Sequence, residues 1–370
     1  MAGPWRVRGV VAGLVAGCVL AAGGCAGGGA DGKAPAAARP SVAPVATVIG
    51  QWQAQQVFDR YVAARKAAVE GLDADGFGRV ETGPLLAESL AVVEARRKRK
   101  ADWPAGVFRR PEFLLPAERD QPGYPRTFVA LSRGDSPIDN QRARAVHYFV
   151  QEAAGVEWKA AVLSWVYDAP RKSGVFDDNA PSLHGYDVRP REVATFARGA
   201  GGEAALSPRA GEDREVCGRY ARWMSFTAPE GDPENADFVP GALTGGLVDA
   251  FNTGPSGWGR VVREQAFEVT GGGAELPVVR LADGRALVTC AFTRTDRWTG
   301  RSVVFQHGGR GSHADVEALL GGGEEPGRWR RTTVRWSVTV TFEVPERGPA
   351  EVVACNCVRP HPLSAEGIPK

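Results

Sequence analysis

The sequence lacks the short motifs that identify many enzymes. It contains no Gly-x-Ser-x-Gly elbow, no Ser-x-x-Lys pair, no phosphate-binding loop and no dinucleotide fingerprint. It also lacks a strong charge, because 45 basic and 43 acidic residues leave a net charge of +2. The electrostatic field of the molecule therefore gives no reason to expect a nucleic acid as partner. We expect no cofactor, no metal and no catalytic residues.

Long apolar runs are missing as well. The N-terminal apolar stretch, Val10–Ala22, is shorter than the about 20 residues that a membrane-spanning helix needs. It follows a segment with Arg6 and Arg8, which is the arrangement of an export signal. Small residues then precede Cys25, and this pattern resembles the lipobox of bacterial lipoproteins. We predict a lipoprotein signal peptide over residues 1–24 and a lipid, such as palmitate, attached to Cys25.

Two alternatives remain open at this end of the chain. Cys18 has Val15 three positions before it, a closer match to the lipobox than Cys25, which has Ala22 there. Processing at Cys18 would leave only Val10–Gly17 as the apolar core of the signal. An ordinary secretory signal cleaved near Ala22 would leave Cys25 unmodified. We favour Cys25 and keep Cys18 as its rival.

Residues 25–50 are predicted to form a tether. Ala26–Thr47 consists mainly of Gly, Ala, Pro and Ser, with almost no large apolar side chain. Such a segment buries too little surface to offset the entropy cost of ordering it. As a flexible chain it would hold the folded part roughly 25 Å from the membrane. We therefore expect a lipid-anchored protein on the extracytoplasmic face of the cell membrane.

The remaining chain predicts two tandem α+β domains. Its 370 residues and 43% hydrophobic content suit a globular protein of that size. We expect an N-terminal domain over 51–168, a linker rich in Pro, Gly and Asp over 169–190, and a C-terminal domain over 191–370. Each domain is predicted to combine helices with an antiparallel sheet.

The first domain has two helical patterns followed by strand patterns. Apolar residues recur at helical spacing within 51–100 and are interrupted by a Gly-rich stretch at 72–83. That stretch is similar to a calcium loop, but Phe77 and Pro84 stand where oxygen ligands are needed, so we predict an interhelical turn. A four-stranded antiparallel meander is then predicted from the β-branched and aromatic runs at 108–115, 126–133, 144–153 and 156–167.

The second domain repeats this order. Helices are predicted at 215–226 and 241–252. Strand patterns follow at 261–270, 277–298, 329–345 and 350–360, with hairpin turns at 282–285 and 346–349. This order of elements resembles the cone-shaped domains of the nuclear transport factor 2-like superfold. That resemblance implies a fold and no particular function.

Three short motifs resemble a family of actinobacterial lipoproteins. They are VETGPLLAESLA at 80–91, YPRTFVALSR at 124–133 and RLADGRALVTCAF at 280–292. Members of that family carry a C-terminal domain of unknown function. The resemblance covers roughly residues 50 to 300. It implies an anchored extracytoplasmic protein of the cell envelope and provides no catalytic residues.

Four cysteines remain after processing at Cys25, and they are candidates for disulfides. They are Cys217, Cys290, Cys355 and Cys357. In an exported protein they are expected to pair, and four cysteines allow three connectivities. We consider a bridge between Cys290 and one of Cys355 and Cys357, with Cys217 taking the other. A direct Cys355–Cys357 bridge is not expected, because one intervening residue of an extended strand places the side chains poorly.

Other candidate residues have structural alternatives. His147 lies mid-strand and could point into a cavity as a general base, or could be a hydrogen-bonded core histidine. His307, His313, Asp315 and Glu317 could bind a cation, but their spacing favours a solvated loop in which Ser312 caps a helical turn. The basic run 96–100 could contact lipid headgroups or form a solvated helix end.

These observations predict a non-catalytic binding protein. Its partner would be an envelope protein or a small apolar ligand, besides the membrane that holds its lipid. Two alternatives stay open. One is an enzyme with a cone-shaped fold that uses a histidine or carboxylate as general base, and the other is a structural scaffold of the cell envelope.

Overall fold

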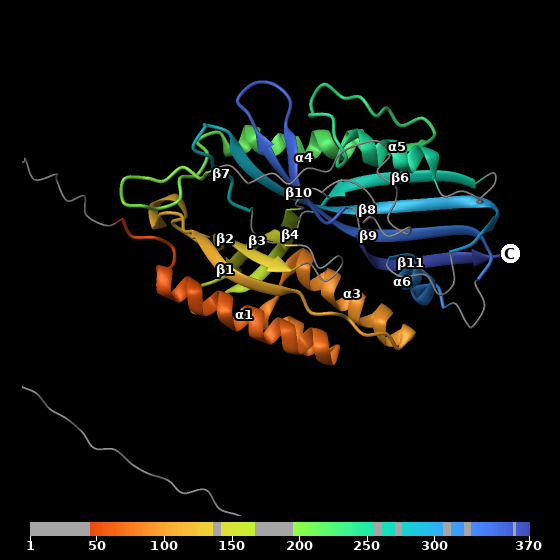
Figure 1. Cartoon of the computed structure of the whole chain (residues 1–370), viewed down its shortest axis with the longest axis horizontal. Helices are drawn as coiled ribbons and strands as arrows, with labels where there is room; N and C mark the ends of the chain where they lie inside the picture. Colours follow the sequence, from red (N-terminus) through yellow and green to blue (C-terminus); the bar gives the residue numbers. More distant parts are fainter. Residues whose placement is uncertain are drawn as a thin grey trace, which may run out of the picture. The chain divides into compact units, whose positions relative to one another are not determined.

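Three helices and a four-stranded sheet form the first half of the folded chain (Figure 1). The computed structural model describes residues 45–135, 142–166, 195–254, 261–270, 276–305, 312–321, 327–357 and 360–370. The elements of the first half are α1 (Gln51–Gly71), α2 (Ala74–Val80), α3 (Gly83–Arg99), β1 (Val107–Leu114), the 3-10 turn η1 (Glu118–Asp120), β2 (Arg126–Asp135), β3 (Arg142–Gln151) and β4 (Lys159–Val166). The strands lie in the order β1-β2-β3-β4 with antiparallel neighbours, which confirms the predicted meander.

Helix α2 occupies the stretch that was predicted to be a turn. Its sequence is rich in glycine, but Phe77 is fully buried and Val80 is nearly so. The ring of Phe77 stacks on Trp103, with 5.4 Å between ring centroids. Burial of these side chains holds a helical conformation that the local sequence does not favour, and the prediction of a simple interhelical turn is wrong here.

The second half contains a seven-stranded sheet with helices beside it. Its elements are α4 (Ala210–Trp223), β5 (Phe226–Ala228), α5 (Gly245–Thr253), β6 (Val261–Val269), β7 (Val279–Arg280), β8 (Ala286–Val303), α6 (Ser312–Leu319), β9 (Trp329–Val344), β10 (Glu351–Cys355) and β11 (His361–Pro369). The order is β10-β9-β8-β6-β5, while β7 pairs with β8 and β11 pairs with β9. Gly284 and Gly348 have positive φ angles in the two predicted hairpin turns. The mixed α+β class with antiparallel sheets is therefore confirmed.

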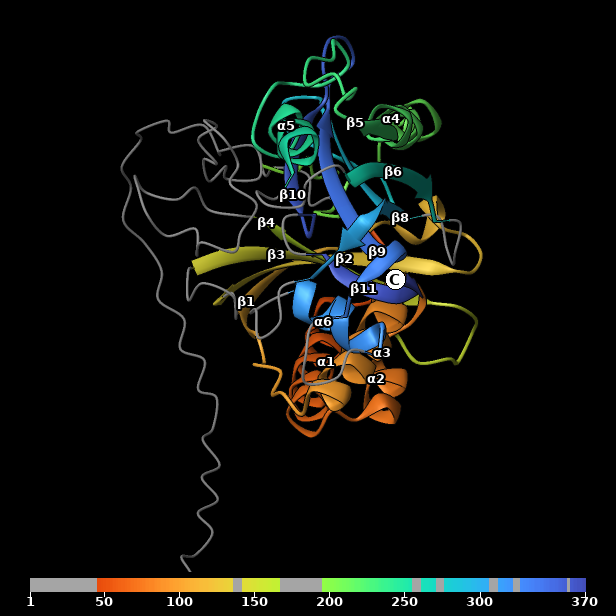
Figure 2. The same cartoon turned by 90° about the vertical axis from the view of Figure 1, so that its right-hand side faces the viewer.

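The two sheets share a hydrophobic core. Along β2 and β3, alternate residues point to opposite faces: Phe128 and Phe149 pack toward α1, whereas Val129 and Tyr148 pack toward the second half. Residues of β7, β8 and β10 complete this second cluster. Figures 1 and 2 show α1 and α3 on one side of the sheets and α4 and α5 on the other. Residues Val42–Lys370 accordingly form one compact unit.

Residues 45–50 differ from the tether predicted for them. Val48 and Ile49 are buried, with 7% and 6% of their surface exposed. The amide of Val48 donates to the carbonyl of Pro116 at 3.0 Å, and Ala46 accepts a hydrogen bond from the amide of Glu118 at 2.9 Å. Two adjacent apolar side chains thus attach this segment to the folded unit. Cys18, Cys25, the rest of the tether and the linker at 169–190 lie outside the described residues.

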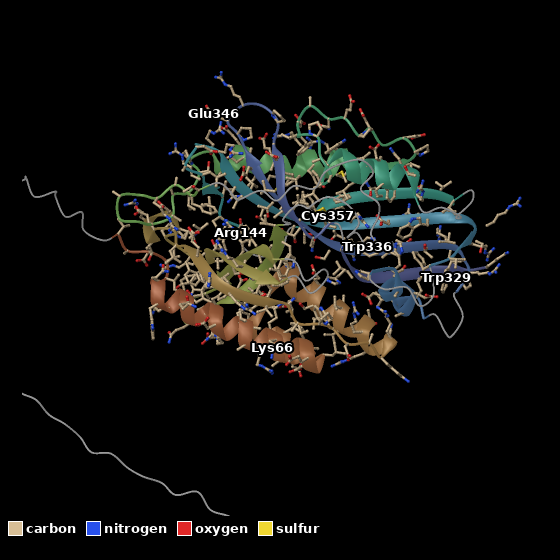
Figure 3. The ribbon with its side chains drawn as sticks, viewed as in Figure 1. Lys66, Arg144, Trp329, Trp336, Glu346 and Cys357 are labelled. Atoms are coloured by element: carbon tan, nitrogen blue, oxygen red, sulfur yellow. A yellow bond between two sulfur atoms is a disulfide. The ribbon has the colours of Figure 1, made fainter. Side chains whose placement is uncertain are left out.

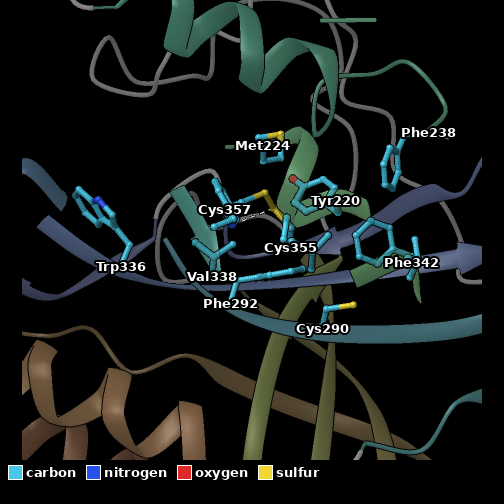
Figure 4. Close-up of a cluster of buried hydrophobic side chains, with 14 of the residues drawn as sticks. Tyr220, Met224, Phe238, Cys290, Phe292, Trp336, Val338, Phe342, Cys355 and Cys357 are labelled. Carbon is cyan, nitrogen blue, oxygen red and sulfur yellow. Dashed lines mark hydrogen bonds between the residues drawn. A yellow bond between two sulfur atoms is a disulfide. The ribbon is translucent and has the colours of Figure 1, made fainter. Parts of the chain in front are cut away.

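Both disulfides lie in the second half, and their connectivity differs from the one considered from the sequence. Cys217 of α4 pairs with Cys290 of β8, because the helix packs on that strand and brings their Cα atoms to 5.8 Å. Cys355 pairs with Cys357 across a bend at Asn356, with 5.2 Å between Cα atoms. The expectation against this bridge assumed an extended strand and is wrong. Cys290, Cys355 and Cys357 belong to the buried cluster around Tyr220 and Phe292 (Figure 4). Cys217 packs against this cluster.

No helix in the described part of the chain is both long enough and apolar enough to cross a bilayer.

Candidate functional site

The face where the chain enters the folded unit carries two open pockets. The first has a volume of about 510 Å³ and lies between the start of α1 and the turn from β3 to β4. It is lined by Val48, Ile49, Gln53, Gln56, Val57, Arg60, Gln151, Glu157 and Trp158. The second has a volume of about 530 Å³ and lies beside residues 45–46. It is lined by Val45, Ala46, Glu118, Arg119, Pro122 and Arg126.

The first pocket combines an aromatic side chain with polar groups. The indole of Trp158 packs edge-to-face on Phe128, with ring centroids 5.0 Å apart, and is fixed by that contact. Arg60 of α1 forms an ion pair with Glu157 at the rim. The side-chain Nε2 atom of Gln151 donates to the carbonyl of Val156 at 2.8 Å. Polar groups beside an aromatic surface can orient a small ligand by hydrogen bonds.

The arginines of the second pocket are already engaged by neighbouring groups. Arg126 donates to Glu118 at 2.7 Å, and its guanidinium lies 5.0 Å from the ring centroid of Tyr124. Arg119 donates to the buried carboxylate of Glu203 at 3.1 Å. These contacts position the side chains and balance their charge, so the charged groups of the pocket wall have no large excess of one sign.

A second polar arrangement is buried between the helices and the sheets. We call Arg65, Glu81, Glu88, Asn356 and His361 the polar cluster. Arg65 turns inward from α1, while the neighbouring Lys66 points outward (Figure 3). The Nε atom of Arg65 lies 3.2 Å from Oε1 of Glu81, whose side chain is fully buried. The guanidinium also lies over two rings, 5.6 Å from Phe77 and 5.4 Å from Trp103.

The other part of the polar cluster joins the two halves of the chain. Glu88 of α3 accepts a hydrogen bond from the Nδ2 atom of Asn356 at 3.1 Å. Nε2 of His361 lies 4.0 Å from Oε1 of Glu88. Asn356 is held in turn, since its Oδ1 atom accepts from the amide of Thr339 at 2.6 Å. The cluster therefore connects α3 to β9 and β11.

Burial shifts the protonation of this cluster. Desolvation raises the pKa of Glu81 to about 7, against the opposing attraction of Arg65. Desolvation also raises the pKa of Glu88 to about 7, although hydrogen bonds from Ser337 and Asn356 favour its ionised form. The pKa of His361 falls to about 4 because burial disfavours its charged form. Burial thus favours the neutral form of both carboxyl groups and of the imidazole.

His147 is placed in the hydrophobic core. It is fully buried, and its ring contacts those of Phe58 and Phe108 at centroid distances of 5.4 and 4.8 Å. Its Nε2 atom lies 2.9 Å from the hydroxyl of Ser132. Burial lowers the pKa of His147 to about 3, followed by the smaller effect of Arg65. These surroundings are those of the hydrogen-bonded core histidine considered from the sequence.

Three residues of the possible cation site, His313, Asp315 and Glu317, lie on α6. Asp315 is buried on α6 and accepts from Arg99 at 2.5 Å and from Arg96 at 3.5 Å. His313 is exposed, and His307 lies outside the described residues. In the part of the chain that the structure describes, no group of three or more His, Cys, Asp or Glu is placed to hold a metal ion. Two side chains of the basic run thus hold α6 against α3.

The polar cluster was missed at the sequence level, although the helical pattern contains a signal for it. Phe58, Tyr61, Arg65 and Ala68 follow the spacing of one buried face of α1. A charged residue on such a stripe indicates a buried partner of opposite charge. Glu88 likewise lies at helical spacing from buried apolar residues of α3. The surface pockets have no comparable signal, since their residues come from three separate segments, 45–60, 118–126 and 151–158.

Comparison with known proteins identifies one region. Residues 45–174 match the family described as Domain of unknown function (DUF8094). No curated protein and no solved structure matches the chain. The matched region begins where residues 45–50 dock on the sheet and includes the three helices and the four-stranded sheet. A domain of unknown function therefore spans residues 45–174, and all residues that line the two pockets lie within it.

Proposed function

We propose that this chain is an exported lipoprotein, held on the extracytoplasmic face of the cell membrane by a lipid on Cys25, and that its folded unit binds a ligand. The export signal and the cysteine that follows it come from the sequence. The Cys217–Cys290 and Cys355–Cys357 bridges support export, because disulfides persist mainly in oxidising compartments. The resemblance to actinobacterial lipoproteins agrees with this location.

The observation that carries the binding role is the first pocket. Three glutamine side chains and the Arg60–Glu157 pair surround the indole of Trp158 within one open cavity. Such a wall suits a small ligand with a planar face and several hydrogen-bonding groups, or a peptide segment with the same chemistry. This is a more polar ligand than the apolar one expected from the sequence.

Catalysis remains an alternative prediction. A general base in this chain would be sought at Glu88 and His361, a carboxylate and an imidazole that are 16% and 24% exposed. Their shifted pKa values suit proton transfer, although structural networks perturb pKa values as well. The first pocket is the better-supported site, because it is a cavity open to a ligand.

Fatty-acid labelling tests the anchor. The wild-type chain is expected to incorporate labelled palmitate in a host that processes lipoproteins, and Cys25→Ala is expected to lose the label. Cys18→Ala is the matched control and should retain it. Loss of label only in Cys18→Ala would assign the anchor to Cys18, and an unlabelled wild type would contradict the lipoprotein proposal.

Native mass spectrometry tests the binding role. The exported full-length protein, kept unreduced, is expected to carry a discrete adduct that is lost in Gln53→Leu/Gln151→Leu. Gln55→Leu is the matched control, because Gln55 lies on the same helix and bonds Asp59 instead of lining the pocket. An adduct that survives in the double variant would place the ligand elsewhere. A wild-type protein that carries no adduct after incubation with envelope extract would contradict the proposal that it binds a small ligand.

A further inference from the structure

We infer that the face where the chain enters the folded unit rests on the bilayer, with Trp52, Tyr124 and Val156 in the lipid interface. We call this face the tether end; it comprises residues 45–53, η1, residues 121–126 and the turn at 152–157. The inference rests on the proposed lipid anchor and adds a second, non-covalent contact with the membrane. The partner of the tether end is the headgroup region of a phospholipid bilayer.

Exposed apolar side chains gather at the tether end. Trp52 is 70% exposed, Tyr124 is 42% exposed and Val156 is 43% exposed. Eight large apolar side chains are exposed among the described residues, and the two aromatic ones are both here. Elsewhere an isolated exposed valine or leucine needs no explanation. An indole with most of its surface in water beside a second exposed ring indicates a partner.

Three separate segments bring these side chains to one end of the sheet. Arg126, two residues after Tyr124, pairs in the sheet with Gln151. Gln151 in turn bonds the carbonyl of Val156 at 2.8 Å. Gln53, next to Trp52, lines the same pocket as Gln151. In Figure 1 this end lies on the left, where residues 45–50 run into α1.

The chemistry of the tether end suits the interface of a bilayer. Trp and Tyr concentrate at the headgroup level of membranes because their rings are apolar and their N–H or O–H groups remain hydrated. The arginines here are balanced by carboxylates in the pairs Arg60–Glu157, Arg119–Glu203 and Arg126–Glu118. Contact would therefore depend on the aromatic side chains more than on attraction to anionic lipid.

The position of the anchor restricts which face can meet the membrane. Nineteen residues, 26–44, separate Cys25 from Val45, the first described residue. As a flexible chain they would span about 25 Å on average. The compact unit Val42–Lys370 has the size of a globule with a radius of gyration of roughly 20 Å, and hence a diameter near 50 Å. The tether end is thus held close to the bilayer, while the opposite end would require an almost extended chain.

Quenching of tryptophan emission by brominated lipid tests the inference. The acylated full-length protein is reconstituted in phosphatidylcholine vesicles with plain or brominated acyl chains, and vesicle-bound protein is isolated by flotation. Brominated lipid is expected to quench part of the wild-type emission, and Trp52→Phe should remove at least about half of that quenchable part. Trp329→Phe is the matched control, because Trp329 lies at the other end of the unit (Figure 3).

A second pair of variants keeps Trp52 as the reporter. Tyr124→Gln/Val156→Gln is expected to reduce the quenching of Trp52 by weakening the contact of the whole face. Val262→Gln/Val269→Gln also replaces two exposed apolar side chains, but on β6, and should leave the quenching unchanged.

The outcomes separate this inference from the proposed anchor. Protein that fails to float with the vesicles would contradict the lipid anchor, and the inference would fall with it. Protein that floats but shows equal emission in plain and brominated vesicles would overturn the inference and leave the anchor standing. Quenching that is unchanged in Trp52→Phe would also overturn it, because Trp52 would then lie outside the lipid interface.

Discussion

Removal of the Cys217–Cys290 bridge is expected to lower the free energy of unfolding by about 4 kcal/mol. The two cysteines are 73 residues apart, so the bridge closes a long loop and restricts the unfolded chain strongly. It also joins α4 to β8, the strand that pairs with β6 and β9 in the middle of the larger sheet. Urea unfolding of Cys217→Ala/Cys290→Ala and of the oxidised wild type, followed by circular dichroism, measures the difference.

The second disulfide provides a matched control within the same chain. Cys355 and Cys357 are only two residues apart, and the same loop-entropy argument gives about 1.5 kcal/mol for Cys355→Ala/Cys357→Ala. Each double variant removes two sulfur atoms next to the same hydrophobic cluster. Equal destabilisation by the two variants would contradict the entropic explanation. Free thiols in the unfolded wild-type protein would show that the bridges are absent.

The meander could be predicted because its signals are local. The run at 126–133 is rich in β-branched and apolar residues and is bounded by Pro125 and Gly134, and it lies within β2. The turn between β3 and β4 has Gly155 at a positive φ angle, as a tight connection needs. Each of these features is encoded within about ten residues and needs no knowledge of distant contacts.

The packing between the halves could not be predicted in this way. Val146 and Tyr148 on β3 are fully buried, as are Ala145 and Phe149 on the opposite face. Such a pattern shows that both faces of the strand are covered but does not identify what covers them. Residues of the second half do so here, including Leu281 and Val353. Val42–Lys370 packs as one compact unit, in which each of the two predicted halves has a sheet of its own.

The pairing of the cysteines and the first pocket could not be predicted from the sequence either. The Cys217–Cys290 pair depends on α4 lying across β8, and no spacing in the sequence reports that contact. The first pocket depends on α1 lying beside the end of β3, which brings Gln53 and Gln151 together from nearly a hundred residues apart. Both features therefore depend on contacts between residues that are far apart in the sequence. Arg65 is different, because its place on an apolar stripe is visible in the sequence.

Replacement of Glu81 by Gln is expected to change the pH dependence of stability by about 3 kcal/mol between pH 4 and pH 8. Desolvation raises the pKa of Glu81 to about 7 from an ordinary value of 4.5. Within that range the folded protein binds a proton that the unfolded chain has released. The stability of the wild type should therefore fall as the pH rises from about 4.5 to 7, while the amide introduced by Glu81→Gln cannot titrate.

The free energy of unfolding is measured as a function of pH for Glu81→Gln and for the wild type. The difference between them at each pH reports the titration of this carboxyl group. Gln keeps the size of the side chain, and the attraction of Arg65 for the ionised carboxylate is already contained in the pKa of Glu81. The stability of Glu81→Gln relative to wild type should thus increase with pH, most steeply between pH 5 and 7. Glu70→Gln removes one exposed carboxyl group of α1 and controls for the change in net charge. A difference that stays constant from pH 4 to pH 8 would contradict a raised pKa and would mean that Glu81 is ionised throughout the folded protein.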